Sequence, residues 1–255
     1  MVVRIVLGTL LILSLLLAGP GWVIASGQVD LRARWAGADR SPAGLAPDPA
    51  STPEAVVQVY AARALAWRGA FGVHPWVAVK ERGAERFTVY EVIGWRVYRG
   101  SSGVVVSARD PDGRWFGTAP TVIAELRGAE AEAAIPKIAA AAERYPYADQ
   151  YRVWPGPNSN TFLAWIGREV PELRLDLPPT ALGKDYLGAM PIARVPSGTG
   201  WQVSLFGLFG VLVALEEGVE VNLLGMTFGF DPLDGALKLP GVGRVGLWSA
   251  EAKER

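Results

Sequence analysis

The hydrophobic pattern of the chain begins with a long uncharged run at the amino terminus. Residues 5–25 contain no charged side chain, and Arg4 precedes them. About 20 apolar residues are enough to cross a bilayer core as a helix. The run therefore predicts an N-terminal apolar helix that inserts into a membrane.

This helix admits two interpretations, a cleaved signal peptide and a retained anchor. The Gly-Pro-Gly at residues 19–21 divides the run, so residues 5–18 resemble the apolar region of a signal peptide. Ala25 is a small residue of the kind that precedes a cleavage site. The anchor is slightly favoured, because the apolar run continues through residues 22–23.

Residues 26–50 are rich in Ala, Gly, Pro and Asp, which is typical of a linker. Ser51 is followed three residues later by Glu54, the spacing of a helix capping box. Because an apolar stretch follows, we predict a helix over residues 52–68.

Alternating apolar and polar positions then predict an antiparallel sheet. Residues 74–82 and 86–95 flank a turn at residues 83–85, so they predict a β-hairpin. A strong turn signal occupies residues 110–113. Further strands are predicted at residues 103–109, 114–118, 121–126 and 151–154, and helices at residues 129–146 and 160–170.

The last third of the chain has a different texture. Residues 201–231 combine β-branched and aromatic residues with repeated glycines, and residues 236–248 predict another strand or two. The apolar run 203–215 is too short to span a membrane as a helix. Glu217-Gly218 lies between two apolar stretches and predicts a hairpin, and a pair of helices over residues 203–215 is the alternative.

These patterns predict an α+β fold. We expect an N-terminal apolar helix, an antiparallel sheet with packed helices, and a β-rich C-terminal extension. The expected divisions are residues 1–25 for the anchor or signal, 26–50 for the linker, 51–178 for the α+β core and 179–255 for the extension packed on that core.

Composition removes several function classes. The chain has 25 basic and 25 acidic residues and no long basic stretch, so nothing indicates nucleic-acid binding. The absence of cysteine excludes disulfides, thiolate metal sites, a Cys nucleophile and lipoprotein lipidation. His74 is the sole histidine, which excludes a His-rich metal site. We therefore expect no metal and no cofactor.

The candidate chemistry centres on the segment WPGPNSNTF at residues 154–162. A Pro- and Gly-rich turn leads into a helix, which places Ser159 at the helix start, with Asn158 and Asn160 as supporting residues. The N–H groups of a first helical turn have no partners within the helix, and they can stabilise an oxyanion. The plainer interpretation is that Asn158 and Ser159 only cap the helix.

The histidine supplies the candidate base. His74 opens the first strand of the predicted hairpin, and the expected register places it opposite residues 92–93, which makes Glu91 a near neighbour that can orient the ring. Tyr90 is the alternative orienting group. A histidine that only packs against Trp76 is the alternative for the ring itself.

The order of these residues resembles circularly permuted papain-like hydrolases, which include NlpC/P60-type proteins. HPWVAVKER followed by TVYEVIGW resembles the histidine strand of that group, and NSNTF resembles its N-C-N-x-F segment. The resemblance covers residues 70–170 and implies a papain-like core, hydrolase or acyltransferase activity, His74 as base and Ser159 at the nucleophile position. The departure is Ser159, which stands where the group has cysteine.

Other stretches, among them DGRWFG, YRVWPGPNSNTF and LPPTALGKDY, resemble a bacterial family known as a domain of unknown function. Two functions follow for the envelope protein that these resemblances imply. One is a hydrolase or an acyl or amide transferase, anchored in the inner membrane by residues 5–25 with its folded part in the periplasm, or free there if the signal is cleaved. The other is an inactive papain-like protein that binds a peptide, glycan or lipid.

Overall fold

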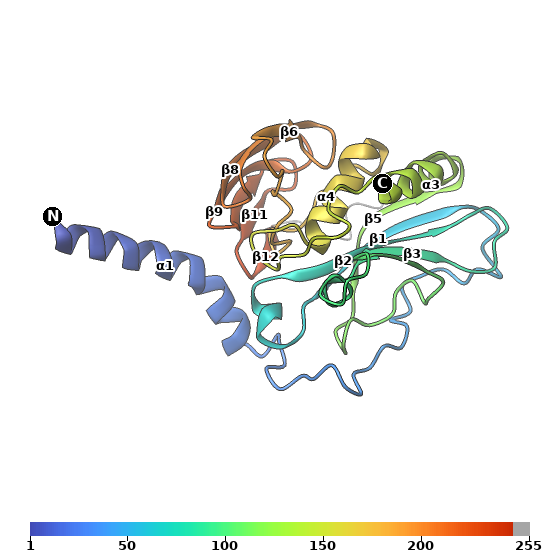
Figure 1. The fold of residues 1–255 in the computed structure, drawn as a ribbon, viewed down its shortest axis with the longest axis horizontal. Coiled ribbons are helices and arrows are strands. Elements are labelled where there is room, and N and C mark those ends of the chain that lie inside the picture. Colours follow the sequence, from blue (N-terminus) through green and yellow to red (C-terminus); the bar gives the residue numbers. More distant parts are fainter. Residues whose placement is uncertain (247–255) are drawn as a thin grey trace.

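The computed structural model describes residues 1–246 (Figure 1). The helix α1, Val2–Ala25, projects from a body that contains two antiparallel sheets and the helices α3 and α4. Within the described part of the chain, α1 is the one helix long and apolar enough to cross a membrane. The predicted α+β architecture with an N-terminal apolar helix is confirmed.

The first sheet has five strands in the order β4-β3-β2-β1-β5. The strands are β1 (Val56–Arg63), β2 (Val73–Lys80), β3 (Thr88–Val92), β4 (Val104–Ser107) and β5 (Thr121–Arg127). The predicted hairpin is confirmed as β2 and β3, and the strands predicted at residues 103–109 and 121–126 are confirmed as β4 and β5. Strand β3 ends early, because the short helix α2 (Gly94–Val97) follows it.

The predicted helix over residues 52–68 is wrong. This segment forms β1 and then the 3₁₀ helix η1 (Ala66–Ala70), and the Ser51 hydroxyl bonds to Asp48 instead of capping a helix. The reason is that β1 lies between β2 and β5 and is buried on both faces, so its apolar residues do not alternate. A continuous apolar strand cannot be distinguished from a buried helix by periodicity.

Two short predicted strands are also absent. Residues 151–154 form an irregular loop, in which the Trp154 indole donates to the carbonyl of Leu224. In the segment 114–118 only Trp115 and Thr118 make an isolated bridge. Both segments contact distant parts of the chain instead of a neighbouring strand.

Helices α3 (Gly128–Glu143) and α4 (Ser159–Glu169) are confirmed and cover one face of the five-stranded sheet. Phe162, Leu163 and Ile166 of α4 are fully buried there with Val77 and Val79 of β2. A second, smaller cluster lies on the opposite face of the sheet, around Tyr60, Trp76 and Val89, with Trp115 packed against it.

The second sheet has seven strands in the order β12-β11-β10-β9-β8-β7-β6. They are β6 (Ile192–Arg194), β7 (Gly200–Leu205), β8 (Phe209–Ala214), β9 (Gly218–Leu223), β10 (Met226–Asp231), β11 (Ala236–Leu239) and β12 (Gly243–Gly246). The hairpin predicted around Glu217-Gly218 is confirmed as β8 and β9, and the helix pair over 203–215 is excluded. The predicted strands over 236–248 are confirmed as β11 and β12 up to residue 246, and residues 247–248 lie outside the described chain.

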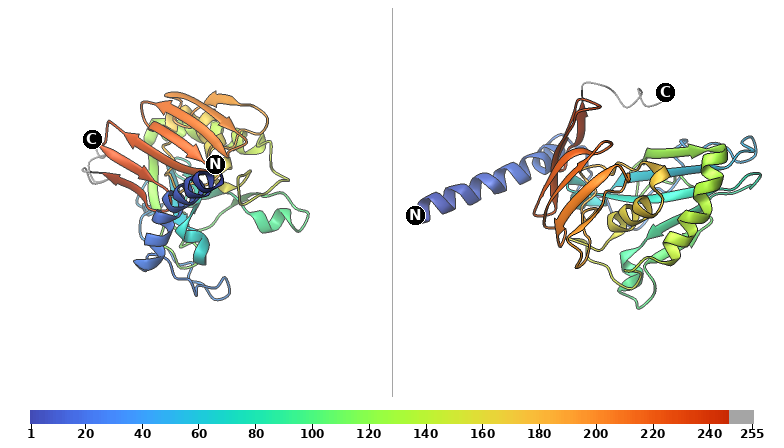
Figure 2. Two further views of the ribbon diagram at one scale, coloured as in Figure 1. Left: turned by 90° about the vertical axis from the view of Figure 1, so that its left-hand side faces the viewer. Right: turned by 90° about the horizontal axis from the view of Figure 1, so that it is seen from above.

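The two faces of this sheet differ sharply. We call the side that faces the helices and the five-stranded sheet the inner face, and it carries buried Gln202, Ser204, Glu220, Asn222 and Lys238. The outer face carries exposed apolar side chains, namely Trp201, Val203, Leu205, Phe209, Val211, Val213, Val219, Val221, Phe230, Leu237 and Val245. Figure 2 shows this sheet face on, with α1 projecting on the outer side.

The C-terminal end of α1 packs against the body. Leu16, Pro20 and Val23 are buried. A Cβ atom at Gly19 would lie 1.9 Å from the carbonyl oxygen of Pro240, which is in the turn between β11 and β12. At Gly19 the helix therefore packs so closely on the turn of the seven-stranded sheet that a residue with a side chain would not fit.

Candidate functional site

The candidate site begins with a buried pair on β2 and β3. The register aligns Val77 with Tyr90, so His74 lies diagonally across from Glu91. The His74 Nε2 atom is 3.0 Å from Glu91 Oε2, and the other carboxylate oxygen accepts from Arg109 Nε at 3.1 Å. The structure thus brings His74 and Glu91 together and adds Arg109 as a third member.

Aromatic rings enclose the pair. His74 and Glu91 are 6% and 5% exposed, and the Trp115 ring stacks on the imidazole with centroids 3.6 Å apart. Tyr90, the alternative orienting group, lies on the other face of the sheet and packs against the core beneath the helices. Glu91 is therefore the partner that orients the imidazole.

Burial and charge set the protonation of this pair. Burial lowers the pKa of His74, and the Arg109 charge acts in the same direction, whereas the hydrogen bond that His74 donates to Glu91 and the charge of Glu91 act to raise it. Burial alone would raise the pKa of Glu91, but the interactions with His74 and Arg109 outweigh it and lower that pKa. The imidazole is then neutral and donates its Nε2 hydrogen to an ionised carboxylate, and Nδ1 is an acceptor without a hydrogen-bond partner among the described residues.

Ser159 is the first residue of α4. The Asn158 side chain caps the helix, because its Oδ1 accepts from the backbone N–H groups of Asn160 and Thr161, and the Thr161 hydroxyl accepts from the Asn158 N–H. Ser159 itself is buried, and its side chain acts to lower the pKa of the nearby Tyr151 phenol, although burial outweighs this and raises that pKa. Asn158 therefore takes the capping role and leaves the Ser159 hydroxyl free of it.

Asn160 joins the start of α4 to the start of β2. Its Nδ2 donates to the carbonyl of Val73 at 3.2 Å and to that of Leu182 at 2.8 Å. Val73 and Asn160 are the chain neighbours of His74 and Ser159, but the contact does not bring the two side chains together. The His74 ring lies with Trp76 and Trp115 on the face of the sheet opposite α4. Among the described residues no hydrogen bond joins the Ser159 hydroxyl to the His74 ring.

An open cleft of about 600 Å³ lies beside the pair. Glu91, Trp95 and Trp115 line it, together with five arginines, Arg40, Arg96, Arg99, Arg109 and Arg114. The Arg109 Nη2 atom is buried and has no hydrogen-bond partner among the described residues. The volume fits a small-molecule ligand, and the arginine excess suits an anionic one.

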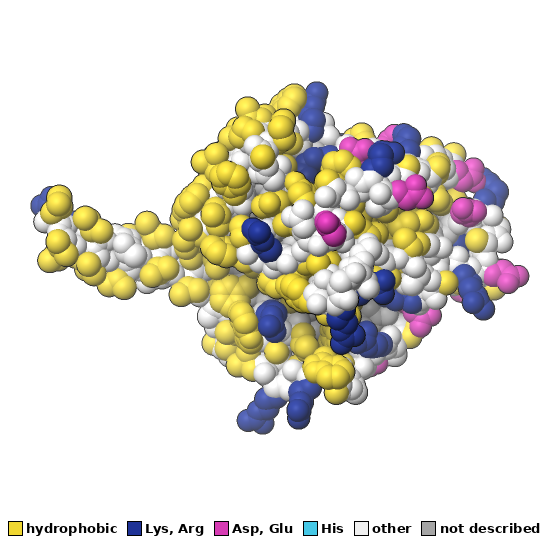
Figure 3. Space-filling model, in the orientation of Figure 1, with side chains coloured by type: hydrophobic (Ala, Val, Ile, Leu, Met, Phe, Trp, Pro, Cys, Tyr) yellow, Lys and Arg dark blue, Asp and Glu magenta, His cyan; other side chains and the backbone are white. Residues whose placement is uncertain are grey.

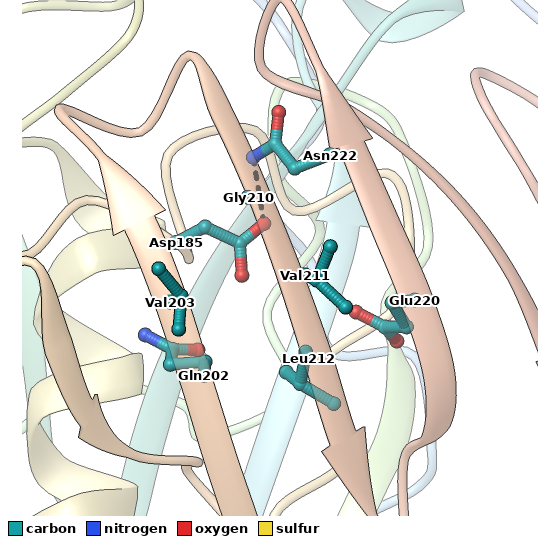
Figure 4. Close-up of a pocket in the computed structure, with 8 residues that line it drawn as sticks. All are labelled: Asp185, Gln202, Val203, Gly210, Val211, Leu212, Glu220 and Asn222. Atoms are coloured by element: carbon teal, nitrogen blue, oxygen red, sulfur yellow. Dashed lines mark hydrogen bonds between the residues drawn. The ribbon is translucent and has the colours of Figure 1, made fainter.

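A second cavity, under the seven-stranded sheet, is much smaller. It has a volume of about 10 Å³ and lies between Asp185, Gln202, Glu220 and Asn222 (Figure 4). Both polar atoms of the Gln202 amide lack partners among the described residues. One water molecule fills such a space, so this cavity completes the polar inner face and is too small for a ligand.

Sequence reasoning missed Arg109, Trp115 and Tyr151. The turn at residues 110–113 gave a weak signal for the first two, because it returns the chain toward β2. Trp76 confirms this return, since its indole donates to the carbonyl of Pro111 at 2.6 Å. The approach of Tyr151 to α4 depends on an irregular loop and left no local pattern.

Within residues 1–246 no group of three His, Asp or Glu side chains could hold a metal ion. A family model described as protein of unknown function (DUF3750) matches residues 54–186, more than half of the chain. The chain belongs to this family. No curated protein and no solved structure matches it. The matched segment contains His74, Glu91 and Ser159 and ends before the seven-stranded sheet begins.

Proposed function

We propose that this protein is a membrane-anchored hydrolase, or acyl or amide transferase, of the bacterial envelope, built on a permuted papain-like core. Ser159 is the nucleophile, His74 the general base and Glu91 the group that orients the base. The observation that carries the proposal is the neutral, carboxylate-paired imidazole at the start of β2. The ring lies on the face of the five-stranded sheet opposite α4, so the reaction requires it to turn around the end of β2 toward Ser159.

The proposed reaction uses these groups in order. The His74 Nδ1 atom takes the proton of the Ser159 hydroxyl while the oxygen attacks a carbonyl carbon, and the imidazolium then protonates the leaving alcohol or amine. A second acceptor, water or another nucleophile, releases the acyl group. Because Asn158 caps two of the first N–H groups of α4, the N–H of Ser159 is the donor left for the oxyanion.

Serine changes the demand on the base. A thiol is converted to thiolate by a neighbouring histidine, but a hydroxyl must lose its proton in the transition state. The depressed pKa of His74 keeps the imidazole unprotonated at neutral pH, which is the form that accepts that proton.

The placement of α1 supports a retained anchor, and we propose the periplasmic side for the folded part. Signal peptidase would remove Val23 and Gly19, yet Val23 is fully buried and Gly19 is in contact with the turn at Pro240. Because the last turns of α1 complete the packing of the body, cleavage after Ala25 would expose the surface that they cover.

One observation favours a second function, the binding of an anionic ligand without catalysis. The residues that line the arginine-rich cleft do not include Ser159. In this alternative Arg109 and its neighbours hold the ligand, and the buried His74–Glu91 pair only positions Arg109.

The test compares Ser159→Ala and His74→Gln with Ser51→Ala, which changes an exposed serine outside the site. Full-length protein in detergent is assayed against ester and amide substrates and for labelling by a fluorophosphonate probe. We expect both site variants to lose activity by at least about 100-fold while Ser51→Ala keeps it. Survival of every activity in Ser159→Ala would refute the assignment. Ligand binding that depends on Arg109, without any turnover, would favour the alternative.

A further inference from the structure

The outer face of the seven-stranded sheet has the polarity expected of a surface in lipid. One cross-strand row consists of Trp201, Val213, Val219, Phe230, Leu237 and Val245. All six are 47–57% exposed. Soluble proteins rarely expose an apolar area this continuous, and such a patch marks a contact with a protein or a membrane.

Ion pairs on the inner face determine which face of the seven-stranded sheet points toward the body. Lys238 donates to Asp176 and Glu220, and Lys184 donates to Glu220 and Asp185. These buried charges fix the polar face against the body. The alternation of the strands therefore leaves the apolar face outward, and a one-residue change of register would bury the valines but expose the ion pairs.

The position of α1 indicates that lipid covers the outer face. It projects from the same side of the sheet, and hydrophobic side chains continue from the helix onto the adjoining end of the body (Figures 2 and 3). Its free part, residues 2–15, rises only about 21 Å, whereas a bilayer core is about 30 Å thick. The helix can cross the core only if lipid also reaches its packed turns, at the level of the turn between β11 and β12.

Aromatic and basic residues lie around this level. Trp67 of η1, which packs on α1, is 56% exposed, and the Arg68 guanidinium lies 5.0 Å from its ring centre. At the β6 edge of the sheet, Arg194 lies 4.5 Å from the ring centre of Trp201. Tryptophan rings and arginine side chains are enriched where a membrane protein meets the lipid headgroups.

The sheet lies on the membrane and does not cross it. Its strands have at most 6 residues, whereas a strand that spans the core has about 9–11. The sheet is also open, with β6 and β12 at its edges, and unpaired strand edges are not stable inside hydrocarbon. A flat placement buries the apolar face and keeps both edges among the headgroups.

We propose that the outer face of the seven-stranded sheet is a membrane-docking surface, which holds the body against the bilayer that α1 crosses. The proposal does not depend on catalysis at Ser159. It implies a fixed orientation, in which the five-stranded sheet lies on the far side of the seven-stranded sheet from the lipid.

The absence of native cysteine makes a direct test available, because a single introduced cysteine can be labelled. Val221→Cys and Val213→Cys report on the outer face, and Val106→Cys, at a site 55% exposed on β4, is the matched control. The full chain, labelled with an environment-sensitive fluorophore, is placed in nanodiscs of phosphatidylcholine and phosphatidylglycerol. Nitroxide-labelled acyl chains probe contact with lipid, and iodide probes contact with water.

We expect the nitroxide lipid to quench more than about half of the fluorescence at positions 221 and 213, and iodide to quench little there. At position 106 we expect the reverse. Equal iodide quenching at all three positions would overturn the proposal. Protection of positions 221 and 213 from both quenchers would assign the face to a second protein copy and would overturn it as well. Using two outer-face positions keeps the test decisive if one variant fails to fold.

Discussion

The two sheets of this protein distribute their apolar side chains differently. In the five-stranded sheet, apolar residues such as Val77 and Trp76 fill clusters on both faces, and the hydrogen-bonded pair His74–Glu91 lies at one end beside a cleft. In the seven-stranded sheet, charged residues fill the buried face and valines occupy the exposed one. Burial of apolar side chains away from water accounts for the five-stranded sheet. The exposed apolar face of the seven-stranded sheet fits the proposed contact with lipid.

Alternation along a strand therefore fixes two faces of a sheet but does not decide which one is buried. Burial normally decides, because apolar area leaves water at a gain of about 25 cal/mol per Å². Here buried ion pairs around Lys184 and Lys238 decide, and the proposed membrane docking gives the outer face its apolar surroundings. Paired substitutions in the two sheets test this explanation.

The largest expected difference is between two phenylalanines. Phe162 of α4 is fully buried in the core beneath the five-stranded sheet, and Phe230 is 49% exposed on the outer face. We expect Phe162→Ala to lower the free energy of unfolding by about 3–5 kcal/mol through the lost burial and the cavity. Phe230→Ala is expected to cost less than about 0.5 kcal/mol in denaturant unfolding with short-chain detergent below its micelle concentration. Equal losses would show that the outer face is part of a protein core.

Two buried lysines give the next comparison. Lys238 donates to Asp176, Glu220 and the carbonyl of Glu217, whereas Lys80 of the five-stranded sheet donates to the backbone carbonyls of Glu54 and Glu81. We expect Lys238→Met to cost about 3 kcal/mol, because it leaves buried carboxylates short of a counter-charge.

Lys80→Met is the matched control, expected to cost about 1–2 kcal/mol because only hydrogen bonds to neutral carbonyls are lost. Urea unfolding of both variants measures the difference. If Lys238→Met is as stable as the native chain, the buried charges do not hold the inner face, and the argument for its orientation fails.

Much of the fold is predictable from local pattern. Helix α4, the β2–β3 hairpin and the strands after Ser204 follow from periodicity and turn residues, which act over a few positions. The His74–Glu91 pair also follows, because a hairpin register places the two residues diagonally. Strand β1 does not, since burial on both faces removes the alternation that marks a strand.

The rest of the site depends on contacts between distant segments. Trp115 reaches His74 through a turn after β4, and Tyr151 reaches Ser159 from an irregular loop. The turn at residues 110–113 indicates only that the chain returns toward β2, and no pattern indicates the approach of Tyr151 to α4. The orientation of the seven-stranded sheet is hidden for the same reason, because the partners of Lys238 and Lys184 come partly from outside the strands.

The contact between α1 and the seven-stranded sheet gives a smaller effect. A Cβ at Gly19 would overlap the carbonyl of Pro240, whereas a Cβ at Gly21 would meet nothing within 4 Å among the described residues. We expect Gly19→Ala to cost about 1–3 kcal/mol by forcing the two surfaces apart. Gly21→Ala is expected to be neutral or slightly stabilising. Thermal unfolding in nanodiscs measures both, and equal midpoints would mean that α1 does not pack on the turn.

The pH dependence of stability gives the smallest expected effect. It distinguishes the titratable groups of the five-stranded sheet from those of the seven-stranded sheet. The pKa of His74 is lowered from its ordinary 6.5, so below that pH the unfolded chain binds a proton that the folded chain does not. Stability therefore falls on acidification from about pH 6.5 down to the folded pKa, by at most about 1.4 kcal/mol per pH unit. Glu91, with its pKa lowered from 4.5, adds a second loss that begins only below that value.

His74→Gln should remove the first loss and reduce the second, because the imidazole that helps to lower the pKa of Glu91 is gone and Arg109 remains. Urea unfolding between about pH 7 and 4 resolves the two effects.

In the seven-stranded sheet, burial raises the pKa of Glu217 above its ordinary 4.5, which opposes the loss on acidification equally in the native chain and in the variant. Burial alone would lower the pKa of Lys184, but the charges of Asp185 and Glu220 outweigh it and raise that pKa, so the contribution of Lys184 is lost only as pH rises above its ordinary 10.5. An unchanged slope between about pH 6.5 and 5 in His74→Gln would mean that another group is responsible, and that the imidazole does not have the depressed pKa that a neutral base at this site requires.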